Sequence, residues 1–419
     1  MVVTDNKKRI YDIPHLEAAG MEGGHFFRLS RADFIKLPHG SELFTLPGRI
    51  PVGYDPAINK FSVFSNLYAV AAFTSPGYTV THNTAYLESP KAAMLPLFSY
   101  GAVTSFKGEF YVAAVRVDRE RRQDLRFMDI DNVKTGVKEI IKLFPKNRLI
   151  RHLKGCALTY GCPAAKNFFL KRYEAPLPTS PYCNAMCIGC ISHQPKKGCS
   201  ITQPRIKFKP TPGEVAEVAL YHIKNVKDPV VSFGQGCEGE PLMVGDILNE
   251  SIKMIRQKTS KGMINLNTNA SLPGTIAKLF DEGLDSIRVS LNSVNTKYYT
   301  AYYKPKGYSF KDVKRSIKIA KKKGGFVSLN YLTVPGFTDL KGEFSAFKDF
   351  IGKHKVDMIQ WRNLNYDPVR YFTEMRIKPA YADMLGMKYV INALSKRFPK
   401  VITGYFNPSN RRIKRGKRL

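Results

Sequence analysis

Apolar and polar positions change their spacing in a regular alternation over the second half of the chain. Short apolar runs with period two predict the strands Val230–Phe233, Met263–Thr268, Ser286–Leu291, Phe326–Leu332 and Met358–Arg362. Segments with apolar spacing near 3.6 precede them and predict the helices Pro212–Val226, Gly245–Lys258, Pro273–Glu282, Lys311–Lys323 and Glu343–His354. This alternation predicts right-handed βαβ units on a parallel sheet.

One further strand, Phe168–Glu174, would bring the sheet to six strands, either open or curled into part of a barrel. Such a sheet places its active groups at the carboxyl ends of the strands. From Tyr366 onward we expect a helical piece, Ala380–Arg397, followed by a basic tail.

The first 150 residues lack this alternation. Short apolar stretches such as Phe61–Phe64, Ala69–Phe73 and Phe110–Val117 are separated by Gly, Pro and Asn, which is typical of a β-rich or mixed α+β domain. A helix is expected around Gly136–Leu143. The expected organisation is a β-rich domain for substrate selection (1–150), a linker with the first strand (151–182), a core (183–366) and a helical extension with a basic tail (367–419).

Composition narrows the class of protein. Apolar residues make up 43% of the 419 residues, and no apolar run reaches eighteen, so we expect a folded protein without a transmembrane helix. The N-terminus MVVTDNKKRIYDIP lacks the pattern of a signal peptide. Together with an odd count of seven cysteines, this predicts a cytoplasmic protein whose thiols bind metal or take part in catalysis.

Charge favours anionic partners without defining a site. The 66 Lys and Arg against 34 Asp and Glu give a net charge of +32, concentrated in Lys311–Lys323 and in the tail Arg411–Arg418. One interpretation is RNA or DNA binding. The other is a solvated helix face, because Val313, Ile317 and Ala320 make an apolar stripe within the first of these runs.

Three cysteines, Cys183, Cys187 and Cys190, are packed into the sequence CNAMCIGC. A [4Fe–4S] cluster normally takes four thiolates, so three ligands on one short loop leave one iron open for chemistry. A zinc site is the alternative, and it would need a fourth ligand from Cys199, His193 or Cys237.

The triplet and the segments after it resemble the radical SAM superfamily over about half the chain, from Cys183 to Tyr366. The resemblance rests on CNAMCIGC and on an ordered series of strand-end motifs. These motifs are GQGCEGEPL (Gly234–Leu242), INLNTNAS (Ile264–Ser271), RVSLNS (Arg288–Ser293), LNYLTVPGFTD (Leu329–Asp339) and IQWRNLNY (Ile359–Tyr366). It implies a partial (β/α)6 barrel of the TIM type, an α/β fold.

The resemblance also implies cofactors and their ligands. Cys183, Cys187 and Cys190 would hold three irons of a [4Fe–4S] cluster, and the fourth iron would bind S-adenosylmethionine (SAM). An electron donor such as flavodoxin or ferredoxin would then allow reductive cleavage of SAM to a 5′-deoxyadenosyl radical, which abstracts hydrogen from a substrate. The substrate would be a peptide or protein side chain, an RNA base or an anionic metabolite.

Seven residues are expected at SAM by the same resemblance. Gly239 and Glu240 would meet the methionine ammonium, with glycine allowing close backbone approach. Ser290 and Asn292 would reach the ribose or the methionine carboxylate. Asn269, Gly336 and Trp361 complete the expected contacts, the last two near adenine. The chain departs from the family at Gly189, where an aromatic residue is common, and this weakens the adenine assignment.

Four cysteines remain outside the triplet. Cys156, Cys162, Cys199 and Cys237 could ligate a second iron–sulfur cluster, although their spacing matches no tight ligand motif and buried free cysteine is common. Two alternatives to catalysis stay open. One is a zinc-containing basic protein that binds nucleic acid, and the other is a radical SAM fold retained as a scaffold without turnover.

Overall fold

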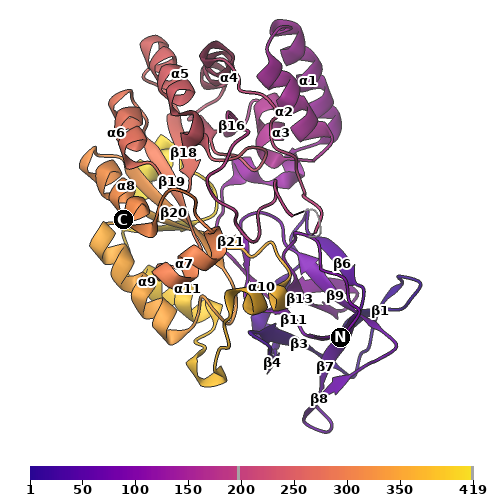
Figure 1. Ribbon diagram of the computed structural model, residues 1–419. Helices are drawn as coiled ribbons and strands as arrows, with labels where there is room; N and C mark the ends of the chain where they lie inside the picture. The colour runs from indigo at the N-terminus through magenta and orange to yellow at the C-terminus, as the bar shows by residue number, and fades with distance from the viewer. Residues whose placement is uncertain (196–198, 417–419) are drawn as a thin grey trace.

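The fold is known from a computed structural model that describes residues 1–195 and 199–416. Its centre is a seven-stranded, fully parallel sheet that curls into a half-barrel (Figure 1). The strands follow one another in chain order: β16 (Glu174–Pro176), β17 (Val230–Phe233), β18 (Met263–Thr268), β19 (Ser286–Leu291), β20 (Phe326–Thr333), β21 (Met358–Asn363) and β22 (Ile402–Gly404). The five central strands confirm the sequence prediction.

Two features of the sheet differ from the prediction. Phe168–Glu174 is not the first strand, because Phe168 ends up inside a helix and β16 begins only at Glu174. The count is seven rather than six, because β22 pairs in parallel with β21 from Met358 opposite Ile402 to Gln360 opposite Gly404. At three residues, β22 is too short for its apolar pattern to be visible in the sequence.

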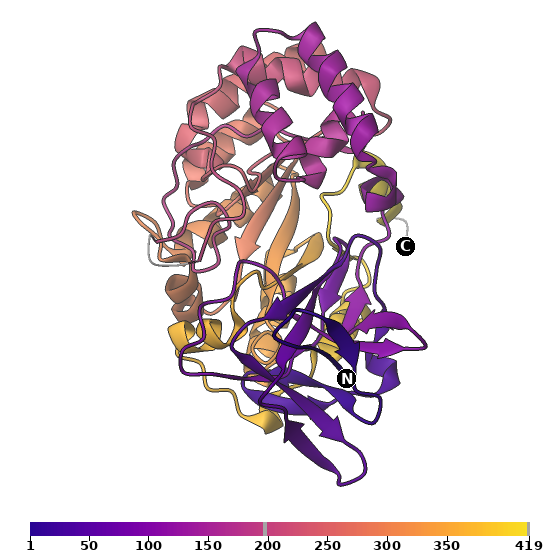
Figure 2. The same cartoon turned by 90° about the vertical axis from the view of Figure 1, so that its right-hand side faces the viewer.

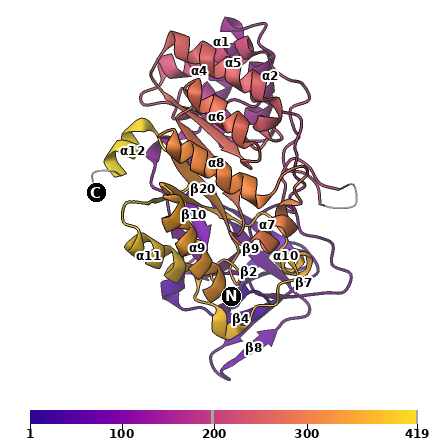
Figure 3. The same ribbon diagram turned by 60° about the vertical axis from the view of Figure 1, so that its left-hand side comes forward.

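Helices cover the outer face of the half-barrel in chain order (Figure 3). They are α4 (Pro212–Asn225), α5 (Gly245–Lys258), α6 (Pro273–Asp281), α8 (Phe310–Lys322), α9 (Lys341–His354) and α11 (Met387–Arg397). The stripe Val313, Ile317 and Ala320 is fully buried, as expected for an amphipathic helix on a sheet. Capping boxes at Thr211 and Ser309 begin α4 and α8.

The inner face of the sheet is polar. Along β18 and β19, Ile264, Leu266, Ile287 and Val289 point outward into the helix layer and are fully buried. The residues between them therefore point inward, because successive side chains alternate across a strand. Polar residues on the inward face of the central strands include Asn265, Asn267, Arg288, Ser290, Ser328, Asn330, Gln360 and Arg362.

A β-rich region is present as predicted, but its strands end at residue 116, and the predicted boundary at residue 150 lies within α2 (Arg148–Leu158). Thirteen short strands make one antiparallel sheet. They are β1 (Val2–Thr4), β2 (Ile10–Asp12), β3 (Glu17–Glu22), β4 (His25–Arg28), β5 (Ile35–Lys36), β6 (Glu42–Leu46), β7 (Arg49–Asp55), β8 (Lys60–Val63), β9 (Tyr68–Phe73), β11 (Asn83–Thr84), β12 (Tyr86–Glu88), β13 (Gly101–Phe106) and β14 (Glu109–Val112). A separate pair joins β10 (Tyr78–Val80) to β15 (Ala114–Arg116).

Three helices lie between this region and β16: α1 (Ile130–Leu143), α2 (Arg148–Leu158) and α3 (Pro163–Phe169). The helix expected at Gly136–Leu143 is confirmed and starts earlier, at an N-cap formed by Asp129. The segment 151–182 was expected to be a linker with the first strand; it contains that strand, β16, but also most of α2 and all of α3. Their apolar faces, including Ile150, Leu153 and Phe168, are buried in the main core, so they are part of the packed domain.

The β-rich region packs beside the open side of the half-barrel (Figure 2). Arg49 of β7 and Asp367, which caps α10 (Pro368–Met375), form an ion pair with an Nη2–Oδ2 distance of 2.8 Å, and both side chains are at most 1% exposed. Asn363 accepts a hydrogen bond from the Val80 backbone N–H and donates to the Tyr78 carbonyl. The two regions therefore share buried polar contacts.

The last element of the described residues is α12 (Asn410–Gly416), and Arg412 of this helix pairs with Asp118 at 2.8 Å. Lys417 and Arg418 of the expected basic tail lie outside the described residues. Within the part that the structure describes, no helix has the length and apolar character needed to cross a membrane.

Candidate active site

The cysteine triplet lies in the irregular segment between β16 and α4, which leaves the sheet at the carboxyl end of β16. Backbone hydrogen bonds to α7 (Thr296–Tyr303) hold this segment. The Met186 and Ile188 N–H groups donate to Tyr303 and Tyr302 carbonyls at 2.9 and 3.0 Å. The triplet is thus anchored at the edge of the sheet where parallel strands place active groups.

The three thiols are neighbours in space. Burial raises the pKa of Cys183 to about 11, and the nearby Glu240 carboxylate adds to this shift. Burial also raises the pKa of Cys187 well above its usual value, and the charges of Cys190 and Cys183 contribute. Arg205 Nη2 and Ser192 Oγ each lie 3.6 Å from Cys190 Sγ. Three adjacent free thiols beside one arginine are a donor set that fits an anionic iron–sulfur cluster.

Gly239 shows why the motif after β17 needs a glycine. A Cβ atom at this position would collide with the Tyr182 carbonyl, immediately before Cys183. The Gly239 N–H donates to the Ser180 carbonyl at 2.6 Å, and the Glu240 N–H donates to the Tyr182 carbonyl at 2.7 Å. The backbone of the motif therefore supports the start of the cysteine loop.

Glu238 joins the same two loops through its side chain. Its buried carboxylate accepts hydrogen bonds from the backbone N–H groups of Thr179, Ser180, Gly234 and Gln235 at 2.6 to 3.0 Å. Burial raises its pKa, while these four donors oppose the shift. Glu238 was not predicted to have a role at the site, because a carboxylate after a glycine-rich turn is also typical of a helix start.

Glu240 lies against β18 rather than free in the site. Its carboxylate accepts hydrogen bonds from Thr268 Oγ1 at 2.5 Å, Asn269 N at 2.7 Å and Leu242 N at 3.2 Å. Burial raises its pKa to about 7. Glu240 therefore ties the ends of β17 and β18 together, next to Cys183.

Asn269 bridges Glu240 to the cysteine loop, since its side-chain Nδ2 donates to Asn184 Oδ1 at 2.7 Å. Ser290 is half-buried on the inner face of β19. Asn292 lies just beyond β19, where its Nδ2 donates to the Tyr298 carbonyl and its buried Oδ1 has no partner among the described residues. The structure thus brings Glu240 and Asn269 to the cysteine loop and places Ser290 and Asn292 along the next strand.

Gly336 and Trp361 have different surroundings. Gly336 adopts φ +85° and packs against Gly23 of the β-rich region, where a Cβ atom would collide. The indole of Trp361 is fully buried on the outer face, with its ring 6.2 Å from that of Phe347 in α9. Any contact of Trp361 with a molecule inside the half-barrel would therefore come from its backbone.

A group of inward-facing residues was not predicted from the sequence. Arg288 Nε, Ser328 Oγ, Asn330 Oδ1 and Gln360 Oε1 are buried without a hydrogen-bond partner among the described residues. Arg362 lies close enough that its charge, after burial, helps to lower the pKa of Arg288 to about 9. Within the described ranges neither arginine forms an ion pair, and Arg362 lies over the Tyr405 ring at 4.0 Å. Their alternation with apolar residues was the signal that could have identified them.

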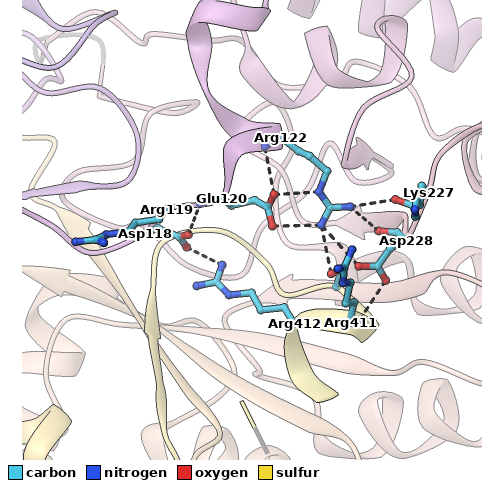
Figure 4. A pocket seen from close by; sticks show the side chains of 9 residues that line it. Asp118, Arg119, Glu120, Arg122, Lys227, Asp228, Arg411 and Arg412 are labelled. Atoms are coloured by element: carbon cyan, nitrogen blue, oxygen red, sulfur yellow. Dashed lines mark hydrogen bonds and ion pairs between the residues drawn. The ribbon is translucent and has the colours of Figure 1, made fainter. Parts of the chain in front are cut away.

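A charged surface pocket lies elsewhere (Figure 4). Lys227 and Asp228, which precede β17, help to line it, so it is at the amino edge of the sheet, opposite the cysteine loop. Glu120 pairs with Arg122 at 3.0 Å, and Arg122 lies 3.7 Å from Asp228. Because most of its charges are paired with one another, this pocket joins segments of the chain rather than forming the active site.

Comparisons with known proteins agree with this geometry. Residues 177–347 match the family model described as the radical SAM superfamily. A relative from Methanococcus aeolicus, described as a probable GTP 3′,8-cyclase, is 31% identical over 169 residues, which are 38% of this chain and 52% of the relative. The chain therefore spans about half the length of that curated relative.

Two solved structures show a partial likeness. Streptococcus suis SuiB bound to its precursor peptide SuiA gives a TM-score of 0.38 at 14% identity, over 62% of this chain and 52% of SuiB. Methylornithine synthase (PylB) gives 0.38 at 16% identity, over 59% of this chain and 72% of that chain.

The class of protein follows from the match of residues 177–347 and the half-barrel. This chain carries a domain of the radical SAM superfamily, which confirms the resemblance found in the sequence. The match begins at Leu177, directly after β16, and ends within α9, so it contains the cysteine triplet and the strands β17 to β20 but not β21.

Proposed function

We propose that this protein is a radical SAM enzyme that acts on a substrate with an anionic group. The observation that carries the proposal is the triplet Cys183, Cys187 and Cys190 at the carboxyl edge of a parallel half-barrel, inside the matched residues 177–347. These cysteines would hold a [4Fe–4S] cluster whose open iron binds SAM. When bound and reduced, this pair of cofactors supplies a 5′-deoxyadenosyl radical that abstracts hydrogen from the substrate.

The residues around the triplet have positioning roles in this proposal. Glu238 and Gly239 hold the start of the cysteine loop through backbone hydrogen bonds. The Glu240 carboxylate accepts a hydrogen bond from Asn269 N at 2.7 Å. This contact keeps the carboxyl ends of β17 and β18 together beside the cysteine loop. Ser290 and the unpartnered Asn292 Oδ1 remain the proposed side-chain contacts to SAM.

The inner face supports the substrate class. Arg288 and Arg362 are two neighbouring cations without an acidic partner among the described residues, and burial of such charge is costly unless an anion joins it. A carboxylate or a phosphate matches the fork of a guanidinium. Unpartnered acceptors on Asn330 and Gln360 would receive hydrogen bonds from hydroxyl or amine groups of the same substrate.

Anaerobic reconstitution with iron and sulfide tests the proposal. Wild-type protein given SAM and dithionite should release 5′-deoxyadenosine, measured by liquid chromatography. Cys187→Ala should lose the cluster absorbance and this product. Glu240→Ala should keep the cluster and bind SAM more weakly, because the backbone around Asn269 loses its anchor.

Two results would contradict the proposal. A colourless wild-type protein after reconstitution, or an intact cluster without any 5′-deoxyadenosine, would contradict it. Mass spectrometry of cellular peptides, RNA and small anions from cells with and without the protein would then identify the substrate.

A further inference from the structure

A second group of metal-ligating side chains lies outside the cysteine triplet. His152 and Cys156 are four residues apart on α2, and Cys237 is in the loop after β17. The three ligand atoms, one imidazole nitrogen and two Sγ atoms, all lie within 4.8 Å of one another. Cys156 and Cys237 are each 2% exposed, and His152 is half-buried. The group therefore lies between a helix and the loop that contains Glu238 and Gly239.

The spacing of these atoms suits a tetrahedral ion. His152 Nε2 and Cys156 Sγ are 3.5 Å apart. With Zn–S bonds of about 2.3 Å and Zn–N bonds of about 2.0–2.1 Å, tetrahedral angles also place the two ligand atoms about 3.5 Å apart. The i, i+4 spacing on α2 presents both side chains on one face of the helix. The helix therefore positions two of the four ligands of a tetrahedral site, and Cys237 supplies a third.

A polar side chain without a full set of partners borders the group. Gln203 is 8% exposed, lies beside Cys156, and has a buried Nε2 without a hydrogen-bond partner among the described residues. Its carboxamide oxygen, or a water molecule, would complete four-fold coordination around an ion held by two sulfurs and one nitrogen. Nitrogen and sulfur donors together favour zinc over magnesium or calcium.

The group is distinct from the second iron–sulfur cluster that the sequence left open. Charges that act on Cys199 come from Asp367 and Glu374, whereas Cys162 and Cys156 act on Cys237. Cys199 therefore lies apart, and the four remaining cysteines do not form one ligand set in the described structure.

We propose that His152, Cys156 and Cys237 bind one structural Zn²⁺ ion, with the two thiol protons released on binding. The ion would clamp α2 to the loop 234–240. That loop contacts the start of the cysteine loop through Glu238 and Gly239, so the bound ion would also stabilise the position of the cysteine triplet. The proposal is independent of the iron–sulfur cluster, because it uses none of the triplet cysteines.

Metal analysis of the full chain tests this site. Protein from zinc-supplemented cultures, desalted anaerobically, should contain about one zinc per chain by mass spectrometry of the element. Cys156→Ser and Cys237→Ser should lose most of it, while the matched control Cys199→Ser should retain it. His152→Cys should keep the ion because it restores a ligand, whereas His152→Phe should lose it.

Cobalt binding tests the site in a chain that keeps His152, Cys156 and Cys237, so the result does not depend on whether variants of these three residues fold. In the full chain carrying Cys183→Ala, Cys187→Ala and Cys190→Ala, Co²⁺ should produce the intense visible bands of a tetrahedral thiolate site and a sulfur-to-metal charge-transfer band. Zn²⁺ added afterwards should remove both signals by displacement.

Three results would overturn the proposal. They are wild-type protein without zinc after incubation with Zn²⁺, equal zinc in wild type and in folded Cys156→Ser and Cys237→Ser, or a purified chain whose mass shows a Cys156–Cys237 disulfide and no metal. None of these results depends on 5′-deoxyadenosine production, so the zinc site can fail while the proposed enzymatic function stands, and the reverse also holds.

Discussion

Single side chains decide what this site can bind, and the arginines of the inner face show how. Arg288 is placed by β19 opposite Asn267 and Ser328, which are neutral and cannot balance its charge. Glu174 contributes only a weaker, opposing influence on its pKa. This arrangement supports our proposal that Arg288 binds an anionic group of the substrate.

Arg288→Met should remove binding of small anions. Phosphate or malonate should raise the melting temperature of the wild type relative to chloride at equal ionic strength, because a ligand that binds only the folded state stabilises it. The effect should disappear in Arg288→Met. Arg315→Met, an exposed arginine on α8 with the same change in charge, is the control. An equal rise in melting temperature in all three proteins would show that the anions bind elsewhere on the protein surface.

His222 should make stability depend on pH. Its ring is 1% exposed in α4 and Nε2 lies 3.3 Å from the Tyr173 carbonyl oxygen, and burial lowers its pKa to about 4. The folded state keeps the ring neutral while the unfolded state takes up a proton below about pH 6.5, so stability falls as the pH drops. The loss from this group should reach about 2 kcal/mol near pH 5.

Urea unfolding of the metal-free chain at a series of pH values measures this dependence. His222→Gln should flatten the fall between about pH 6.5 and about pH 5. His15→Gln, an exposed histidine, should leave it unchanged. An unaltered slope in His222→Gln would contradict the assignment.

At the scale of elements, the long strands and helices could be predicted from the sequence, whereas the short strands and the contacts between loops could not. The central strands and their helices follow from local periodicity, which their lengths of four to fourteen residues make visible. The strands β16 and β22 have only three residues each, and their pairing with neighbours defines them. The contacts of Glu238 and Glu240 also could not be predicted, because Thr179 and Ser180, which bind Glu238, and Thr268 and Asn269, which bind Glu240, lie far from them along the chain.

Glu238→Ala should loosen both loops that it joins. Two buried and two partly buried backbone donors would lose their acceptor, at a cost on the order of 3 kcal/mol or more. Hydrogen exchange should accelerate at the amides of Thr179, Ser180, Gly234 and Gln235, and iron incorporation should fall. Glu250→Ala, at an exposed position on α5, is the matched control. Unchanged exchange at these four amides would argue against the role.

At the scale of the molecule, buried polar contacts join the β-rich region to the half-barrel. Asp367 begins α10 by accepting from the Val369 and Arg370 N–H groups, and it also accepts from Leu95 N and pairs with Arg49. Gly336 packs against Gly23 at the same junction. These contacts hold the β-rich region beside the open side of the half-barrel, where we propose that it selects the substrate.

Arg49→Leu should weaken this junction strongly. It leaves the buried Asp367 carboxylate without its cation, and breaking a buried pair in this way costs about 3–5 kcal/mol. Denaturation followed by hydrogen exchange should show residues 1–116 opening before the half-barrel. Arg126→Ala removes an arginine from an exposed ion pair with Asp124 and should change little. A single unfolding transition with unchanged stability in Arg49→Leu would refute this role.

The sequence by itself determined the parallel βαβ order, the polar alternation of the inner face and the three-cysteine loop, because each is a local pattern in continuous chain. Only the tertiary structure decided which distant groups meet. Cys237 lies beside His152 and Cys156, although 81 residues separate it from Cys156 in the sequence. Arg362 likewise lies near Arg288, and Arg49 pairs with the distant Asp367. Such contacts depend on how strands and helices pack together, and no period in the sequence encodes that packing.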